Sequence, residues 1–116
     1  MMEIIYSNKK DQKICEDSRY ATKKIGALPA RNLAMLMGAI MSSTDLSDIA
    51  VMPQFRLHQL KGDKKDRYSF SIDRQNRVEF YPLDEHRNIL KSGTNEKEMY
   101  KKTRYIQITG ITNHYE

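Results

Sequence analysis

The feature that most constrains the fold is a change in the spacing of apolar residues near position 53. Before it, Leu33, Leu36, Met37 and Ile40 stand at i, i+3, i+4 and i+7, which places them on one face of a helix. After it, apolar and polar residues alternate, as in half-buried strands. The alternating segments are 55–58, 67–73, 77–81 and 104–112. The sequence therefore predicts an α+β fold.

The first third of the chain carries the predicted helices. The predicted elements are a short N-terminal strand at 2–6, a helix at about 8–25 with a break near Asp17 as an alternative, and a helix at about 29–42. Gly26 separates the helices, because glycine commonly ends a helix. We expect the two helices to pack on one face of a twisted antiparallel sheet.

Size and charge set the class of partner. The 116 residues allow one domain, 1–116, with a modest core. Lys and Arg (20) exceed Asp and Glu (15), and such a basic balance favours a polyanionic partner: nucleic acid, an acidic protein or an anionic membrane surface. A single Cys excludes an internal disulfide. Neither a secretory signal pattern nor an apolar run of about 18 residues is present, so we expect a cytoplasmic protein and no membrane partner.

Alternation sorts the strand residues into two faces. The apolar set is Phe55, Leu57, Tyr68, Phe70, Ile72, Val78, Phe80, Ile106 and Ile108. The polar set is Arg56, His58, Arg67, Ser69, Ser71, Arg77, Glu79, Tyr81, Tyr105, Gln107 and Thr109. Residues 54–77 hold seven cations against three acids, and four of the seven are Arg. Arginine suits bidentate phosphate contacts, and interleaved Tyr and His offer stacking surfaces for bases. A merely solvated face is the alternative.

The central segments carry a family resemblance. Residues 55–65 read FRLHQLKGDKK, 68–72 read YSFSI and 77–80 read RVEF. They resemble the R-L-H-x-L-K-G-D-[RK] run, the following Y-S pair and the R-[IV]-x-F strand of the HigB branch of the RelE/ParE toxins. The similarity extends over about 1–82 and 104–115. The charged interval 84–103 is longer than expected for that family and is predicted to be an insertion or a mobile hairpin.

The resemblance implies a RelE-like fold and a type II toxin that cleaves mRNA in the ribosomal decoding site. It also implies a HigA-like helix-turn-helix antitoxin, which would bind operator DNA as part of a toxin–antitoxin hetero-oligomer. In this branch a His and the Lys three residues later carry catalytic weight, here His58 and Lys61. The family pattern Asp-Tyr-His at the last strand is replaced by Asn113-His114-Tyr115, so the roles of these tail residues are open.

Metal-free RNA cleavage requires a proton acceptor for the 2′-hydroxyl and cations for the phosphorane. His58 is the candidate acid or base, because imidazole titrates near working pH. Neither a metal nor a cofactor is expected. The other candidate catalytic residues are Lys61, Arg77, His114 and Tyr115. The candidate RNA-binding residues are Arg56, Lys64, Lys65, Arg67 and Asn113.

Two other functions fit the same residues. One is a ParE-like toxin that inhibits gyrase without hydrolysis. The other is a catalytically decayed module that only binds antitoxin, suggested by the altered tail. Retention of His58 with Lys61 favours the nuclease, because a pure binding surface needs no titrating group.

Overall fold

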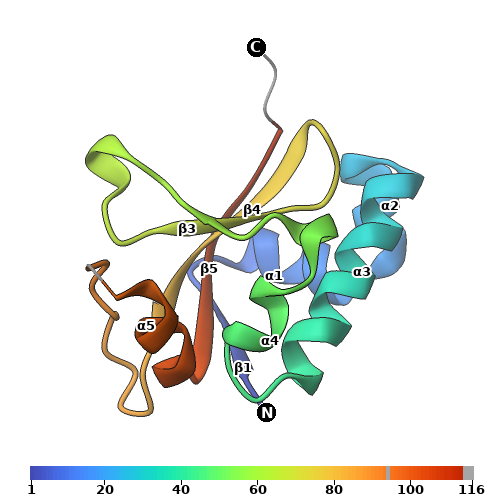
Figure 1. Cartoon of the computed structure of the whole chain (residues 1–116). Coiled ribbons are helices and arrows are strands. Elements are labelled where there is room, and N and C mark those ends of the chain that lie inside the picture. Colours follow the sequence, from blue (N-terminus) through green and yellow to red (C-terminus); the bar gives the residue numbers. More distant parts are fainter. Residues whose placement is uncertain (94, 114–116) are drawn as a thin grey trace.

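The computed structural model describes residues 1–93 and 95–113 and shows the predicted α+β architecture (Figure 1). Its five strands form one sheet in the order β1-β5-β4-β3-β2. The strands are β1 (Glu3–Tyr6), β2 (His58–Gln59), β3 (Tyr68–Ser71), β4 (Asn76–Leu83) and β5 (Tyr105–Asn113). None of the helices in the described ranges is long and apolar enough to cross a bilayer.

The sheet is mixed, whereas the sequence predicts an antiparallel one. The first strand, β1, runs parallel to β5, with Glu3 opposite Tyr105 and Tyr6 opposite Ile108. The other neighbouring strands are antiparallel. A parallel pair requires a long crossover connection, and here almost the whole chain lies between the two strands. Alternation identifies a strand but not its partner, which is why the prediction of an all-antiparallel sheet is wrong.

The predicted first helix is split at Asp17. The helices are α1 (Lys9–Glu16), α2 (Ser18–Ile25), α3 (Ala27–Ser42), α4 (Ser47–Ala50) and α5 (Glu96–Lys102). Asp17 has extended backbone, and its side chain accepts hydrogen bonds from the amides of Arg19 and Tyr20, so it caps α2. Gly26 separates α2 from α3 with a φ of 98°, a conformation that glycine adopts without steric cost.

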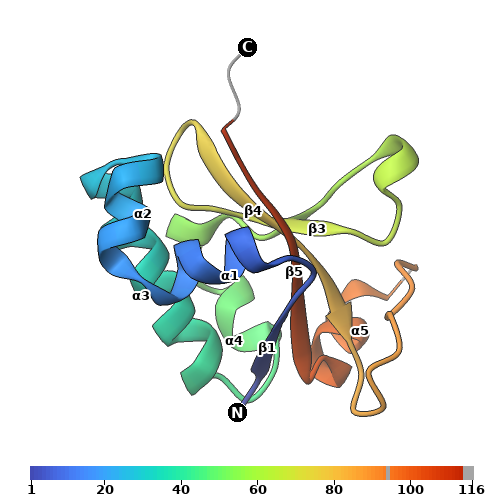
Figure 2. The same cartoon turned by 180° about the vertical axis from the view of Figure 1, so that it is seen from behind.

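The apolar side chains of one face of the sheet are buried, as the alternation predicts. Phe70 and Phe80 are fully buried and stack with ring centroids 4.4 Å apart. The apolar stripe of α3 is buried in the same core. Figures 1 and 2 show α1, α2 and α3 grouped at one end of the molecule, with α5 at the other. On the polar face of β3 and β4, Ser69 and Glu79 are nevertheless buried.

The predicted strand at 55–58 forms only at its last residue, His58, where β2 begins. Pro53–Phe55 is a short 3-10 helix, Arg56 takes a left-handed conformation with a φ of 42°, and β2 is only two residues long. Proline at the start of this segment has a fixed φ suited to a helical turn and lacks a donor for a ladder. The exposed, polar character of His58 is nevertheless as predicted.

The interval 84–103 contains a helix that the sequence interpretation missed. Helix α5 buries Met99 and Tyr100, and the Tyr100 ring lies 6.1 Å from that of Tyr68 in β3. The connection before it is held by Asp66, whose carboxylate accepts hydrogen bonds from the amide and hydroxyl of Ser92 at 2.8 Å. The segment therefore contributes to the core.

Candidate functional site

The strand register brings His58 and Arg77 to the same side of the sheet. His58 lies opposite Ser69, and Ser69 lies opposite Glu79. Arg77 is two residues before Glu79 on β4, and it forms an ion pair with that residue. His58 and Arg77 also line one shallow hollow of about 190 Å³, together with Arg56 and the turn between β3 and β4. We call this hollow the hairpin pocket.

A buried carboxylate lies at the centre of the polar face. Glu79 is only 3% exposed, yet three cations contact it. Lys64 Nζ lies 3.1 Å from both carboxylate oxygens. Arg77 donates from Nε at 3.1 Å and forms an ion pair at 2.9 Å through a terminal nitrogen. The third cation is Arg67, which has a terminal guanidinium nitrogen 3.5 Å from a carboxylate oxygen of Glu79. We call these four residues the Glu79 cluster.

The cations keep the Glu79 carboxyl ionised. Burial raises its pKa, but hydrogen bonds and charges from Lys64 and Arg77 outweigh burial and hold the pKa below its ordinary value. The cluster therefore contains three positive charges and one negative charge. Alternation places Glu79 on the polar face, but sequence reasoning did not single it out as a functional residue.

The surroundings of His58 define which ring nitrogen carries a proton in the neutral form. Nδ1 lies 2.8 Å from the carbonyl oxygen of Arg56, which can only accept, so Nδ1 is the donor. Nε2 is then the free acceptor, with the hydroxyl of buried Ser69 at 3.4 Å. Arg56, whose carbonyl oxygen contacts His58, has a left-handed backbone conformation. Such backbone strain is characteristic of functional sites.

Arg67 is held in place from two directions. Besides its contact with Glu79, it donates from a terminal nitrogen to the Tyr81 hydroxyl at 3.2 Å, and its guanidinium lies 5.1 Å from the Tyr81 ring centroid. The hydrogen bond to Tyr81 is the main reason that the pKa of Arg67 is raised. A phosphate that approaches this arginine meets a partly preorganised guanidinium.

The remaining predicted cations are more loosely placed. Arg56, Lys61 and Lys65 are exposed. None of the ion pairs found within 1–93 and 95–113 involves them. Lys61 stands two residues after the end of β2 and so lies near the same edge of the sheet as His58. These side chains can reach toward a polyanion, and no ion pair within the described part of the chain fixes them.

The turn before Arg77 is closed by hydrogen bonds to Asp73. The Asp73 carboxylate accepts hydrogen bonds from the amides of Gln75 and Asn76 and from the Asn76 side chain. Burial raises the pKa of Asp73, but these hydrogen bonds outweigh burial and leave the pKa lowered. A charged Asp73 thus closes the turn at the mouth of the hairpin pocket and fixes where β4 begins.

The predicted tail residues are only partly described. Asn113 ends β5, with its backbone opposite Asn76 at the start of β4. Asn76 lines the hairpin pocket, so β5 ends beside it. His114 and Tyr115 lie outside the described residues. Within those residues, no group of three His, Cys, Asp or Glu is arranged to hold a metal ion.

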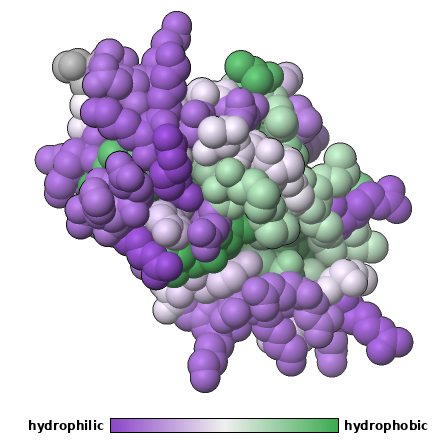
Figure 3. Space-filling model, turned by 90° about the horizontal axis from the view of Figure 1, so that it is seen from below, coloured by the Kyte–Doolittle hydropathy of each residue, from purple (hydrophilic) through white to green (hydrophobic). Residues whose placement is uncertain are grey.

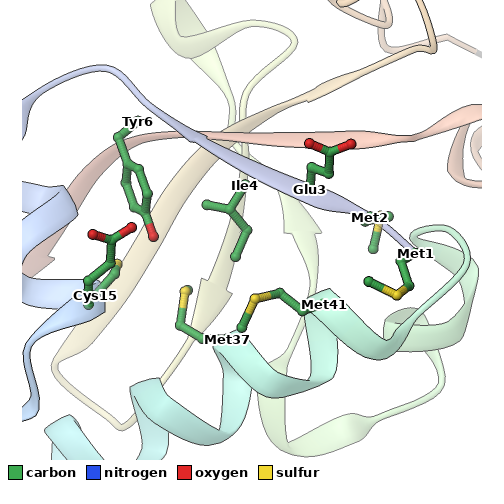
Figure 4. A pocket seen from close by; sticks show the side chains of 9 residues that line it. Met1, Met2, Glu3, Ile4, Tyr6, Cys15, Met37 and Met41 are labelled. Carbon is green, nitrogen blue, oxygen red and sulfur yellow. The ribbon is translucent and has the colours of Figure 1, made fainter.

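A larger hollow of about 530 Å³ lies at the opposite edge of the sheet, between β1 and α3. Figure 4 shows Ile4, Met37 and Met41 pointing into it, with the Tyr6 hydroxyl near Cys15. Burial raises the pKa of the Cys15 thiol to about 12, so the thiol is protonated at neutral pH and is a poor nucleophile. The view from below shows apolar surface between hydrophilic margins (Figure 3). This edge offers packing rather than chemistry.

Comparisons with known proteins agree with this architecture. No family model matches the sequence, and comparison with curated proteins gives no match. Among solved structures, the chain is similar to the YoeB/ParE toxin from Agrobacterium tumefaciens, with a TM-score of 0.52 and 13% sequence identity over 98% of this chain and 100% of that one. The chain therefore has the fold of a YoeB/ParE toxin over nearly its whole length.

Proposed function

We propose that the chain is a cytoplasmic type II toxin of the HigB kind that cleaves mRNA on the ribosome. The observation that carries the proposal is the meeting of His58 and Arg77 at one pocket, beside cations held on a buried carboxylate. The fold shared with a YoeB/ParE toxin supports the toxin assignment. The FRLHQLKGDKK segment supports the HigB assignment.

The proposed reaction is attack of a ribose 2′-hydroxyl on the adjacent phosphate. The 2′-oxygen forms a bond to phosphorus, and the bond from phosphorus to the 5′-oxygen of the next nucleotide breaks. His58 either takes the 2′-hydroxyl proton at Nε2, the nitrogen left free by the Arg56 carbonyl, or, when protonated there, gives a proton to the leaving 5′-oxygen; the second group carries out the other transfer. Arg77 and Lys61 stabilise the charge on the phosphorane. His114 or Tyr115 is the proposed second proton-transfer group.

The strand of RNA is proposed to follow the polar face. Arg56, Lys64, Lys65 and Arg67 would contact phosphates, and Asn113 would contact the nucleotide at the end of β5. Arg67 and Lys64 are the best prepared of these, since contacts with Glu79 limit their rotamers. Binding by several cations in this way implies a marked dependence of affinity on salt.

A ParE-like gyrase inhibitor is the second candidate, because the similar solved structure is named a YoeB/ParE toxin. Either function implies an antitoxin, which we propose to be HigA-like, with a helix-turn-helix that binds the operator. The Met-lined hollow between β1 and α3 has the adaptable apolar character that suits such a partner. Co-expression with such an antitoxin should then restore the growth of cells that produce the toxin.

Induction of the chain in cells, without an antitoxin, separates the functions. The nuclease proposal predicts rapid arrest of translation, with transcripts cut inside translated regions. Gyrase inhibition predicts a DNA-damage response with intact transcripts, and no effect on growth indicates a decayed module. A His58→Ala chain that still cuts transcripts would remove His58 from the mechanism.

A further inference from the structure

We infer that Glu79 is the positioning residue of the proposed nuclease site: its buried carboxylate sets the orientation of Arg77, Arg67 and Lys64 toward one RNA phosphate. The inference rests on the proposed function, which it deepens by assigning a role to a residue that does not itself touch the substrate. Four observations carry it: the burial of Glu79, its contacts, the register of the strands and the charge balance of the cluster.

Burial and contacts exclude a direct catalytic role. Glu79 is 3% exposed, and both carboxylate oxygens are occupied by Lys64, while Arg77 adds two contacts to one of them. Its pKa is held below the ordinary range. A carboxylate with so little access and so little tendency to take a proton is a poor general base. It can act only through the cations that cover it.

A purely stabilising role does not account for the arrangement. Position 79 lies in the middle of β4, between fully buried Val78 and Phe80, whose side chains point to the opposite face of the sheet. Replacing a buried ion pair by well-packed apolar residues is often neutral or stabilising. A buried acid with cationic partners is therefore weak evidence for a role in stability alone. What it does give is a fixed point for three long, flexible side chains.

The register connects this fixed point to the hairpin pocket. Glu79, Ser69 and His58 lie in one row across β4, β3 and β2, and Arg77 is the next residue of the same face of β4. The contact of Arg77 with Glu79 at 2.9 Å therefore determines where its guanidinium lies relative to the imidazole. An arginine has five donors in a rigid fork, so donors remain for a phosphate after Glu79 is satisfied.

The charge balance makes a testable distinction. With Glu79 ionised, the cluster carries three positive charges and one negative charge, a net charge of +2. The isosteric substitution Glu79→Gln raises this to +3 and retains a carbonyl acceptor. Attraction for a polyanion should then increase, while the orientation of the cations is lost. A residue that merely supported the fold would affect binding and turnover together.

The experiment compares wild type with Glu79→Gln in two assays. Binding is measured with a short single-stranded oligonucleotide, all 2′-deoxy and hence uncleavable, over a range of salt. Turnover is measured on translated RNA. We expect unchanged or tighter binding, with a slope of log affinity against log salt steeper by about 0.7. We expect kcat to fall by about 10- to 100-fold, as for loss of well-oriented electrostatic stabilisation.

Two results would overturn the inference. One is a folded Glu79→Gln chain whose kcat equals that of wild type. The other is a loss of kcat and a loss of affinity that are both equal to the fraction of Glu79→Gln that is unfolded at the assay temperature, as measured by thermal unfolding. If Glu79→Gln does not fold, Glu79→Asp, which keeps the charge at a shorter reach, is used. It should show the wild-type salt slope with a reduced kcat, and an unchanged kcat in this variant would also contradict the role.

Failure of the proposed function looks different. A wild-type chain that binds the deoxy strand but cuts no RNA would remove the nuclease activity. The role of Glu79 is then tested on the side-chain NMR signals of Arg67 and Arg77. Those signals should be sharp and dispersed in wild type and averaged toward free arginine in Glu79→Gln. Signals that are averaged already in wild type would show that the carboxylate positions nothing.

Discussion

Two basic regions of this molecule differ in how their charge is held. The corner of α1 and α2 carries six cations, all exposed, and its only contacts of note are Lys13 and Lys24 over the ring of Tyr20. The six are Lys9, Lys10, Lys13, Arg19, Lys23 and Lys24. The polar face of the sheet instead gathers Lys64, Arg67 and Arg77 on one buried carboxylate. Both regions are basic, but only in the sheet region do ion pairs with a buried acid hold the cations.

The difference shows what distinguishes a candidate site from a solvated surface. Exposed lysines must lose rotamer freedom when they bind. The Glu79 cluster has restricted its cations in advance, and one of them, Arg77, lines the same pocket as His58. Preorganised groups contribute to a transition state without reorganising. We therefore expect chemistry to depend on the sheet face and to be nearly indifferent to the helical corner.

Removal of the His58 imidazole should have the largest effect on RNA cleavage. We expect His58→Ala to lower kcat for RNA cleavage by about 10²- to 10⁴-fold, since proton transfer contributes about that much. His86→Ala is the matched control, because His86 is exposed in a turn after β4 and does not line the hairpin pocket, and this variant should cleave normally. Equal losses in both variants would remove the special role of His58.

Exchange of arginine for lysine tests whether orientation or charge alone matters in each region. Arg77→Lys keeps the charge but loses the fork that contacts Glu79 through two nitrogens. We expect kcat to fall by about 10- to 100-fold. Arg19→Lys on α2 makes the same exchange at an exposed position and should change kcat little. A tolerated Arg77→Lys would mean that charge alone, without orientation, is sufficient.

The sequence predicted the sheet face well and its internal contacts poorly. Alternation placed His58, Arg77 and Glu79 on the polar face, because side-chain direction in a strand depends only on local spacing. Convergence of Lys64 on Glu79 depends on the turn after β2, which folds back over β4. No periodicity encodes that contact. The pairing of β1 with β5 and the helix within 84–103 were missed for the same reason, since both depend on distant partners.

The salt dependence of binding to a single strand should also differ between variants of the sheet face and variants of α1 and α2, with a smaller effect. Lys61→Gln removes an exposed cation from the His58 edge of the sheet, so the slope of log affinity against log salt for a single strand should become shallower by about 0.7. Lys24→Gln removes one charge from α2 and should leave the slope unchanged. Fluorescence anisotropy with a labelled deoxy strand measures both. A shallower slope for Lys24→Gln alone would move the binding surface to the helices.

Acidification should have the smallest effect, a loss of folding stability that depends on Glu79 in the sheet face. The pKa of folded Glu79 lies below its ordinary value of 4.5, so its ionised form contributes stability above that pH, and this is lost as pH falls through the folded pKa. The free energy of unfolding of wild type, relative to Glu79→Gln, should therefore shrink as the pH falls below the ordinary value of 4.5 and through the lower folded pKa. Urea titrations measure it. A constant difference would show that the carboxylate is not held ionised.

The most direct test is an NMR titration of the wild-type chain with a short all-2′-deoxy single strand, observing the side-chain signals of Arg67, Arg77, Arg19 and His58. We predict that Arg67, Arg77 and His58 shift together and saturate together, while Arg19 stays in place. Shifts of Arg19 and of α1 and α2, with the sheet arginines unmoved, would contradict the account.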